Sequence, residues 1–479
     1  MIKLALDEVV SAIGGQPTTR VRAMAVQSVS TDSRTTAPDS VFFALSGENF
    51  DGHQFIRAAF ERGALAAVVE RGRFVACERD AADWLNRGRT LVAVDSPLEA
   101  LGRLAHFHRK QLAADVIAVV GSNGKTTTKM MIDHVLKSRR RGVCSPKSFN
   151  NAIGVPITLF SAAAADEYVV VEIGTNHPGE VAALGRIAEP QIAVITSIGE
   201  EHLEGLRDLR GVATEECSIL PCVRSGGFAA VNLDAPHLRE FLVEGVCAWV
   251  GYGEAADAAL RVTDVRQTPS GLAFRINGKF EYQMPVFGAH NAWNAAAAIA
   301  VARRLGLDHD AIAHELAGFR GPPMRGEWID VAGVSVLNDA YNANPASMAA
   351  ALDSLDAIAG ERRRFVVLGE MRELGDSSPR CHEAIARRAA KIRCEALVLV
   401  GAAAKMMAPA ARAAQPAAKT IIECVDAAAA GRFLAEAAEP GDMVLLKASR
   451  GVRLEAALDA WRAALAAGST QPTSPIAAA

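Results

Sequence analysis

The sequence lacks the patterns that would indicate export, membrane insertion, a metal cluster or an extended basic surface. No apolar run reaches the roughly 18 residues that a membrane-spanning helix needs, and the stretch MIKLALDEVVSAIGG has no signal-peptide core. Eight cysteines are scattered without a C-x-x-C pair, so we expect buried, reduced thiols in a cytoplasmic protein. The formal net charge of -3 provides no overall basic field for nucleic acid or anionic lipid, so an anionic ligand needs local binding groups.

The length of 479 residues is too great for one ordinary domain and predicts two to four. Half of the residues are hydrophobic and 22% are charged, which is typical of a globular chain with large cores. No internal repeat is present. We divide the chain into 1–95, 96–322 and 323–465, followed by a small, polar tail over 466–479 that we expect to be disordered.

Short apolar runs alternate with helix-period segments along most of the chain. Such runs are typical of strands buried on both faces, which predicts α/β domains with doubly wound parallel sheets. We expect a small N-terminal α/β domain, a central parallel-sheet domain and a Rossmann-like C-terminal domain. The predicted strands are 28–32, 41–45, 66–70, 115–120, 168–173, 192–198, 228–232, 334–338, 365–368, 396–400 and 443–447, and the clearest predicted helices are 53–62, 98–111 and 289–306, the last stopped by Gly306.

The strongest local motif lies between a predicted strand and a predicted helix and reads Gly121-Ser122-Asn123-Gly124-Lys125-Thr126-Thr127-Thr128. Glycines let backbone N–H groups face phosphates, the helix N-terminus adds a positive dipole end, and Lys125 can reach the β- and γ-phosphates. The hydroxyl of Thr126 or Thr127 can hold Mg²⁺. Val119 occupies the first glycine position of the full Walker pattern, so the motif has the shorter G-x-x-G-K-T form and predicts a P-loop ATPase-like central domain.

Two further residues follow buried strands of the central domain. Glu172 ends YVVVE, at the sheet edge where α/β proteins bind ligands, and one or two carboxylates are what Mg²⁺ bound to ATP takes from a protein. His202 follows the next strand, although a lone histidine there is more often structural. Glu215 and Glu216, taken as a bare pair, indicate a solvated helix face.

Polar residues of the later chain could complete a nucleotide site. Asn291 and Asn294 lie near a helix start, where asparagine either reads an adenine edge or serves the helix end. Arg325 is a candidate fork for phosphate. The loop 339–345 ends the strand that we expect to be first in the third domain, and Lys447, Ser449 and Arg450 end its last strand, in a further arrangement suited to anions.

Together and in this order, these motifs resemble the Mur ligase superfamily over nearly the whole chain except the tail. The segments that carry the resemblance are SFNNAIGVPITL from Ser148, EIGTNHPGEV from Glu172, ITSIGEEHLEGL from Ile195, FGAHNAWNAAAA from Phe287, NDAYNANPASM from Asn338 and LGEMRELG from Leu368. The DAYNANP and NHPGE stretches are similar to the branch that adds D-alanyl-D-alanine, and no DNPR-type stretch of the diaminopimelate-adding branch is present. The resemblance implies an ATP-dependent ligase of peptidoglycan synthesis, with a monomer as the default state.

The resemblance also implies roles for individual residues. It implies that Lys125, Glu172, His202 and Arg325 are catalytic, and that Thr126, Glu172, His202 and Glu216 bind metal. Residues 121–127 with Asn291, Asn294, Arg325 and Asp339 would bind ATP. The substrate-binding positions are, for the UDP moiety, Ser30, Thr31, Asp32, Ser33, Arg34, Ser46, Gly47, Phe50, Asp51 and His53, and near the reacting groups Asn150, Asn151, Tyr341, Asn344 and Ser347.

The chain departs from the family pattern at Glu216, which stands where many relatives have a lysine that is carbamylated to bind magnesium. Glutamate already has the carboxylate that the carbamate would supply. We therefore expect Glu216 to hold a second Mg²⁺ directly or through water, and its shorter side chain favours water. LGEM in place of LGDM is a minor difference.

The implied chemistry is activation of the tripeptide carboxylate by ATP as an acyl phosphate, followed by attack of the D-alanyl-D-alanine amine. This chemistry needs positioning and charge neutralisation more than a protein nucleophile, and no Ser-His-Asp or Cys-His pattern is evident. Three alternatives remain open: a sister ligase with another amine substrate, such as a folylpolyglutamate-type enzyme, a nucleotide-binding protein without catalysis, and a P-loop kinase.

Overall fold

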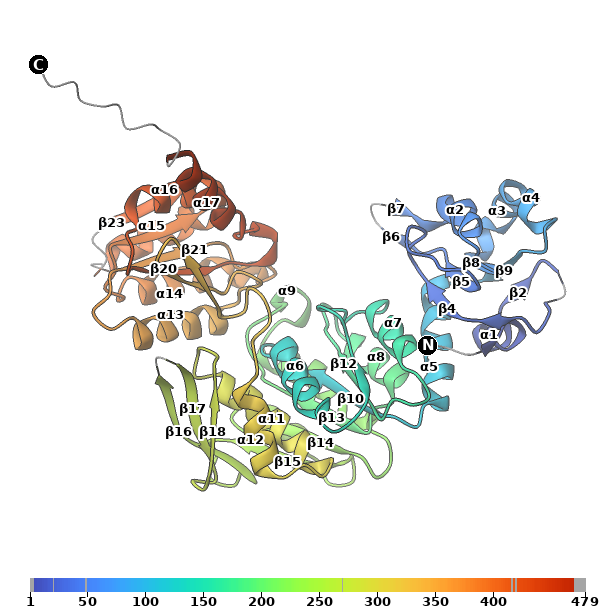
Figure 1. Cartoon of the computed structure of the whole chain (residues 1–479), viewed down its shortest axis with the longest axis horizontal. Coiled ribbons are helices and arrows are strands. Elements are labelled where there is room, and N and C mark those ends of the chain that lie inside the picture. The colour runs from blue at the N-terminus through green and yellow to red at the C-terminus, as the bar shows by residue number, and fades with distance from the viewer. Residues whose placement is uncertain are drawn as a thin grey trace, which may run out of the picture.

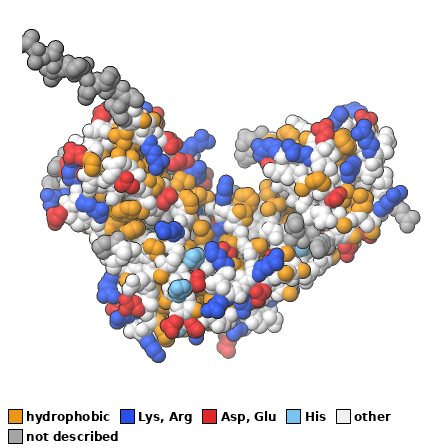
Figure 2. Space-filling model, in the orientation of Figure 1, with side chains coloured by type: hydrophobic (Ala, Val, Ile, Leu, Met, Phe, Trp, Pro, Cys, Tyr) orange, Lys and Arg blue, Asp and Glu red, His pale blue; other side chains and the backbone are white. Residues whose placement is uncertain are grey.

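The computed structural model describes residues 4–19, 21–47, 50–268, 270–414, 417 and 420–468. Three α/β lobes follow one another along the chain, each built on its own main sheet (Figure 1). This arrangement confirms the predicted fold class of three α/β domains. Figure 2 shows a deep notch that separates the N-terminal lobe from the C-terminal lobe on the side opposite the central lobe.

The N-terminal lobe has a five-stranded sheet in the order β2-β9-β8-β5-β4. Its middle strands β5, β8 and β9 are parallel and almost entirely buried, because helices cover both of their faces. The strands of the lobe are β1 (Leu4–Ala5), β2 (Gln16–Pro17), β3 (Ala25–Val26), β4 (Ser28–Ser30), β5 (Ser40–Phe43), β6 (Ser46–Gly47), β7 (Phe50–Asp51), β8 (Ala66–Glu70) and β9 (Thr90–Val94). Its helices are α1 (Leu6–Ile13), η1 (Gly52–Phe55), α2 (Ile56–Glu61), η2 (Arg71–Arg73), α3 (Phe74–Asp80) and α4 (Ala82–Leu85).

Helix α5 (Pro97–Gln111) joins the N-terminal lobe to the central lobe. Ser96 caps it by accepting a hydrogen bond from the Glu99 backbone, and proline occupies its first turn. At the middle of the helix, Arg103 Nε donates to Ile13 O of α1 at 3.2 Å. Near its end, the fully buried Arg109 donates to Ala188 O at 2.7 Å. One continuous helix is therefore bonded to both lobes.

The central sheet has nine strands in the order β11-β12-β10-β13-β14-β15-β16-β17-β18. It is parallel from β11 to β16, and β17 pairs antiparallel with β16 and β18. The parallel strands β10, β12, β13 and β14 were predicted, whereas β11, β15, β16, β17 and β18 were not. Strands β16 and β18 alternate buried and more exposed residues and so lack a continuous apolar run, whereas β17 is mostly buried but has only the short apolar run 272–274. The strands are β10 (Asp115–Val120), β11 (Gly142–Cys144), β12 (Tyr168–Glu172), β13 (Ile192–Ile195), β14 (Phe228–Asn232), β15 (Ala248–Gly253), β16 (Leu260–Thr268), β17 (Gly271–Ile276) and β18 (Phe280–Met284).

Helices pack on both faces of the parallel part of this sheet (Figure 1). They are α6 (Lys125–Leu136), α7 (Gly154–Ser161), α8 (Glu180–Ala188), α9 (Leu203–Leu206), α10 (Leu209–Cys217), η3 (Leu220–Cys222), η4 (Leu238–Phe241), α11 (Asn291–Arg304) and α12 (His309–Ala317). Helix α11 is the predicted late helix, and Gly306, with φ of 92°, follows its end.

The C-terminal lobe has a six-stranded sheet in the order β19-β20-β24-β21-β22-β23. Strand β19 pairs antiparallel with β20 and precedes it, so the prediction that 334–338 is the first strand of this region is wrong. The strands are β19 (Glu327–Val331), β20 (Val334–Asn338), β21 (Arg364–Leu368), β22 (Ala396–Val400), β23 (Thr420–Cys424) and β24 (Met443–Lys447), and the helices are α13 (Pro345–Ala359), η5 (Gly375–Ser377), α14 (Ser378–Ala389), α15 (Ala402–Ala413), α16 (Ala427–Ala437), η6 (Arg450–Val452) and α17 (Ala456–Gly468).

The end of the chain was predicted to be disordered from residue 466. Helix α17 continues to Gly468, and residues 469–479 lie outside the described residues. Within the described part of the chain, no helix has the length and apolar character of a membrane span.

Candidate active site

A cavity of about 1010 Å³ lies between the central and C-terminal lobes. Residues at the carboxyl ends of β10, β12 and β13 line it from the central lobe, and residues after β20 and β24 line it from the C-terminal lobe. Carboxyl ends of parallel strands are where α/β sheets place ligands. Two such edges therefore share one cavity.

The phosphate-loop motif forms a tight turn between β10 and α6. Gly121 and Gly124 have φ of 119° and 83°, which residues with a side chain rarely adopt. A Cβ atom at Gly124 would also lie 2.2 Å from Asn294 Oδ1. Lys125 donates from Nζ to Gly121 O and also lines the cavity. The loop therefore has the backbone shape and the free N-terminal helix end that phosphate binding needs.

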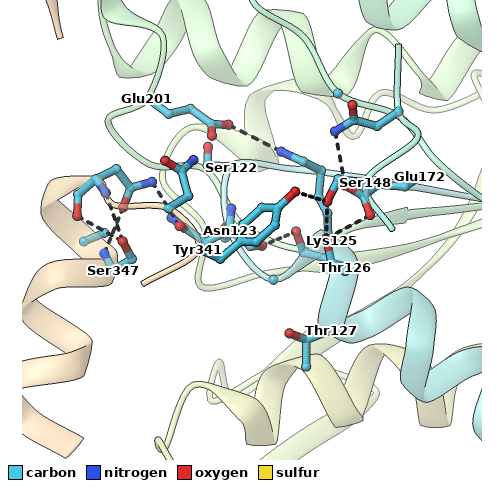
Figure 3. Close-up of a pocket in the computed structure, with 18 of the residues that line it drawn as sticks. Ser122, Asn123, Lys125, Thr126, Thr127, Ser148, Glu172, Glu201, Tyr341 and Ser347 are labelled. Carbon is cyan, nitrogen blue, oxygen red and sulfur yellow. Dashed lines mark hydrogen bonds and ion pairs between the residues drawn. The ribbon is translucent and has the colours of Figure 1, made fainter. Parts of the chain in front are cut away.

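Glu172 lies beside the start of α6 and contacts three side chains. Its Oε2 accepts from Thr126 Oγ1 at 2.9 Å, and its Oε1 accepts from Asn150 Nδ2 at 3.1 Å (Figure 3). Lys129, which the sequence reasoning missed, lies 3.0 Å from Oε2, and the two side chains are 1% and 2% exposed. In the sequence Lys129 is one lysine among several in a helix, and only its place one turn after Lys125 hinted at a role.

A cluster of buried carboxylates surrounds Lys125. Glu201 Oε1 is 3.9 Å from Lys125 Nζ (Figure 3), and Glu216 Oε2 accepts from the Gly121 backbone at 2.8 Å. Burial raises the pKa of Glu201, and it raises the pKa of Glu216 to about 8. Burial acts against the charge of Lys125, but Glu201, Glu216 and Glu172 outweigh it and raise the lysine pKa.

Two acidic residues of α10 have different roles, and neither forms the solvated face that a bare pair suggested. Glu216 is fully buried behind the phosphate loop and does not line the cavity. Glu215 is 5% exposed and accepts from the Gly179 and Val181 backbones at 2.6 and 2.7 Å, so it satisfies N–H groups at the start of α8.

His202 reaches the cavity from the loop after β13 and meets the other lobe. Its backbone is left-handed, with φ of 48°. Nδ1 lies 2.6 Å from Glu373 Oε2 of the C-terminal lobe, and Nε2 lies 3.8 Å from Glu201 Oε2. Burial opposes protonation, but the two carboxylates prevail and raise the pKa of His202. Neither Glu201 nor Glu373 was predicted, although both stand in segments that carried the family resemblance.

Other contacts tie the two lobes together around the cavity. Tyr341 donates from its hydroxyl to Ser148 Oγ at 2.8 Å (Figure 3). Asn344 caps α13 by accepting from the Ser347 backbone, and it donates to Asn123 Oδ1 at 3.0 Å. The predicted loop 339–345 therefore faces the phosphate loop directly.

The remaining predicted residues near the nucleotide also line this cavity. The Arg325 guanidinium lies 4.1 Å from the centre of the Tyr341 ring, and Asp339 forms an ion pair of 2.6 Å with Lys447. Asn294 donates to Asn291 Oδ1 at 2.9 Å. The predicted positions that line the cavity are Ser122, Asn123, Gly124, Lys125, Thr126, Thr127, Asn150, Asn151, Glu172, His202, Asn291, Asn294, Arg325, Asp339, Tyr341, Asn344 and Ser347.

The predicted UDP-binding residues lie in the N-terminal lobe, and none of these described residues lines the cavity. They form two groups. Asp32 and Arg34 form an exposed ion pair of 2.7 Å in the loop after β4. Asp51 lies 2.7 Å from His53 and 2.6 Å from Arg73, near the exposed ring of Phe50.

The residues around the phosphate loop suit a magnesium ion that is shared with phosphates. Among the described residues, no group of three or more His, Cys, Asp or Glu side chains could hold a metal ion by itself. Mg²⁺ at phosphate sites takes only one or two protein carboxylates, and Glu172 lies beside the Thr126 hydroxyl. Glu201 Oε1 and Glu216 Oε1 are buried without a hydrogen-bond partner among the described residues, so this carboxylate-rich site fits a further cation.

Comparison with known proteins agrees with this geometry. Three family models match: "Mur ligase family, catalytic domain" over 25–109, "Mur ligase middle domain" over 119–302 and "Mur ligase, glutamate ligase domain" over 324–450. The UDP-N-acetylmuramoyl-tripeptide–D-alanyl-D-alanine ligase of Bacillus subtilis is 34% identical over 434 residues, 90% of this chain and 92% of that protein. The ligase of the same name from Escherichia coli is 31% identical, over 84% of this chain and 86% of its own length.

Solved structures give the same result over the whole chain. The crystal structure of MurF from Acinetobacter baumannii has a TM-score of 0.85 and 28% identity, and covers 97% of this chain and 99% of its own. The MurF ligase from Thermotoga maritima in complex with ADP has a TM-score of 0.80 and 26% identity, over 92% and 99%.

Proposed function

This chain belongs to the Mur ligase family, and from that membership we propose its reaction. It joins D-alanyl-D-alanine to a UDP-N-acetylmuramoyl tripeptide with consumption of ATP, forming the pentapeptide precursor of peptidoglycan. The observation that carries this proposal is the shared cavity, in which the phosphate loop of one lobe faces the DAYNANP loop of the other. A nucleotide bound at the phosphate loop can thus transfer phosphate to a substrate carboxylate. The DAYNANP loop of the other lobe can hold that carboxylate next to the amine.

The reaction has two steps. The tripeptide carboxylate attacks the γ-phosphate of ATP, which gives an acyl phosphate and ADP. The amine of D-alanyl-D-alanine then attacks the acyl carbon, an amide bond forms, and phosphate leaves. A carboxylate alone is a poor electrophile, and the acyl phosphate supplies the leaving group that it lacks. Enclosure between two lobes would protect this intermediate from water.

The proposed catalytic groups neutralise charge during phosphate transfer. Lys125 would exchange its bond with Gly121 O for the β- and γ-phosphates, and Arg325 would approach from the C-terminal side. Residues 121–127 would hold the phosphates, and Asn291 and Asn294 would lie at the adenine. Asn294 donates to Asn291 and accepts from Thr128, and Asn291 donates to Phe287 O, so both amide groups are held in place at the cavity wall.

Magnesium would offset the negative charge of the phosphates. The proposed ligands are Thr126, Glu172 and His202, with Glu216 acting through water because it lies behind the loop. One carboxylate oxygen each of Glu201 and Glu216 has no hydrogen bond among the described residues, which supports a cation at this site.

The substrates extend beyond the cavity. We assign the UDP moiety to the N-terminal lobe at residues 30–34, 46–47, 50–51 and 53, and the reacting ends to Asn150, Asn151, Tyr341, Asn344 and Ser347. The divisions at 95/96 and 322/323 remain the proposed domain boundaries. Because the reaction consumes ATP, we place it in the cytoplasm, and we propose that the chain acts as a monomer.

The test is phosphate release from ATP with Mg²⁺, the UDP-N-acetylmuramoyl tripeptide and D-alanyl-D-alanine, with each component omitted in turn. Release should require all of them and give a pentapeptide product by mass. Tripeptides that end in L-lysine or in meso-diaminopimelate should be compared, since the third residue sets substrate choice. Release that is indifferent to D-alanyl-D-alanine would contradict the assignment.

A further inference from the structure

Glu373 is the residue of the C-terminal lobe that touches the proposed metal site. It lies in LGEMRELG, the loop that follows β21, with a left-handed backbone of φ 64°. Its carboxylate crosses to the central lobe and lies 2.6 Å from His202 Nδ1. Its side chain remains 57% exposed, so burial alone does not account for its position.

The loop that carries Glu373 is anchored to its own lobe immediately before that residue. The Met371 backbone donates to His382 Nε2 at 2.9 Å, and the Arg372 backbone donates to Ser449 Oγ at 3.0 Å. Gly375 then packs against the backbone of Glu204 in α9. Because the loop is fixed to the C-terminal lobe, its carboxylate reaches His202 only when the two lobes are docked.

The contact leaves the second imidazole nitrogen available. Metal-bound histidines usually offer one nitrogen to the cation and the other to a carboxylate or carbonyl, which fixes the ring and its tautomer. Here the Glu373 carboxylate forms an ion pair with Nδ1, and Nε2 lies 3.8 Å from Glu201 Oε2. Two ligands of one octahedral Mg²⁺ at about 2.1 Å are separated by roughly 3.0 Å in neighbouring positions and about 4.2 Å in opposite positions. The separation of 3.8 Å lies between these two values, so one side chain must shift for both groups to bind the same cation.

We propose that Glu373 is a positioning residue that couples docking of the C-terminal lobe to cation binding by His202 and Glu201. The inference rests on the proposed function, which assigns His202 as a metal ligand. Without Glu373 the imidazole loses the partner that orients it, so Nε2 no longer points steadily at the cation. Coupling of this kind is reciprocal, and the cation must therefore favour the docked arrangement by the same factor.

The test measures Mn²⁺ binding to the full chain in the presence of ADP, by electron paramagnetic resonance, with His202→Ala used to identify the site that depends on His202. Glu373→Ala should weaken that site by about 10- to 100-fold, as is typical when such an outer partner is lost. Glu373→Gln keeps an oxygen acceptor and should fall between wild type and Glu373→Ala. The radius of gyration from X-ray scattering should fall when Mn²⁺ and ADP bind to wild type, and less so in Glu373→Ala.

Arg380→Gln is the matched control, because Arg380 also crosses between the lobes but does not contact His202. It forms an ion pair of 2.8 Å with Glu200. This variant should keep Mn²⁺ affinity within about twofold, and the melting temperatures of all variants should agree. Equal affinity in wild type and Glu373→Ala would overturn the proposal. So would an equal loss in Arg380→Gln, since Glu373 would then be only one interface contact among several.

Failure of this inference and failure of the ligase assignment give different results. If wild type makes the pentapeptide but Glu373→Ala binds Mn²⁺ normally, only the coupling is wrong. If wild type makes no pentapeptide, the ligase assignment fails whatever the Mn²⁺ measurement gives. If His202→Ala leaves every Mn²⁺ site intact, His202 is no ligand and the coupling falls with it.

Discussion

The buried pair of Lys129 and Glu172 gives the sharpest test of how this site is built. Both side chains are at most 2% exposed, and their charged atoms are 3.0 Å apart. Lys129 also donates to Ser145 O at 2.9 Å and to Lys147 O, so it holds the segment that leads to Ser148. Replacement by methionine keeps much of the volume and removes the positive charge and these bonds.

The expected loss of stability in Lys129→Met comes from the Glu172 charge, which is left without its ion-pair partner. Removing one partner of a buried ion pair lowers the free energy of unfolding by about 3–5 kcal/mol, because the other charge stays in the low-dielectric protein interior. Thr126 and Asn150 still donate to Glu172, but both are neutral. For a lobe of roughly 150–250 residues, 1 kcal/mol corresponds to about 2–4 °C, so Lys129→Met should lower the central-lobe transition by about 6–20 °C.

Calorimetry of wild type, Lys129→Met, Glu172→Gln and the double variant measures this directly. The double variant has no unpaired charge, so its free energy of unfolding should be at least about 2 kcal/mol higher than that of Lys129→Met. Mg²⁺ with ADP should raise the melting temperature of Lys129→Met more than that of wild type, because the uncompensated carboxylate gains a cation. A loss below about 1 kcal/mol in Lys129→Met, or strictly additive variants, would refute this account of the pair.

Three further predictions concern single residues. Lys125→Met should lower phosphate release by about 10²–10³ or more, by analogy with loss of one charge-stabilising donor, whereas the exposed Lys137→Met on the same helix should have no effect. Glu216→Ala should raise the Mg²⁺ concentration for half-maximal activity, and an unchanged requirement would contradict its role at the metal. Burial lowers the pKa of His382 below its ordinary 6.5. Below pH 6.5 the histidine therefore binds a proton more readily in the unfolded chain than in the folded chain. The stability that neutral His382 contributes above pH 6.5 is lost as the pH falls. In a pH series of melting temperatures from 7 to 5, His382→Asn should show a shallower decline than wild type.

The sequence was sufficient where function depends on local backbone form. The phosphate loop needs two left-handed glycines between a strand and a helix, and both requirements can be read from neighbouring residues. Glu172 was predicted because it ends a continuous apolar run, which places it at the sheet edge. The parallel core strands were predicted for the same reason.

The sequence was insufficient where a role depends on distant segments. Glu216 appeared to be one of two solvated acids, but the phosphate loop lies about 95 residues earlier and buries it. Lys129 becomes a partner of Glu172 only because the segment after β11 folds over it. Glu373 meets His202 across a lobe boundary, and neither local periodicity nor charge spacing reports such a contact. Strands β16, β18 and β19 were missed because their buried residues alternate with more exposed ones, and β17 was missed because its apolar run is short.

Helix α5 has a consequence for which substrates can react. It is hydrogen-bonded to the N-terminal lobe through Arg103, at its middle, and to the central lobe through Arg109, near its C-terminal end, so one helix fixes how the two lobes are joined. If the proposed UDP site lies in the N-terminal lobe, a substrate held there would have to present its carboxylate at the phosphate loop of the central lobe. The helix would then help to set the distance that the substrate must span, and a stem peptide of another length would place its carboxylate away from the phosphate. Selection by length would need no pocket for the side chains in between.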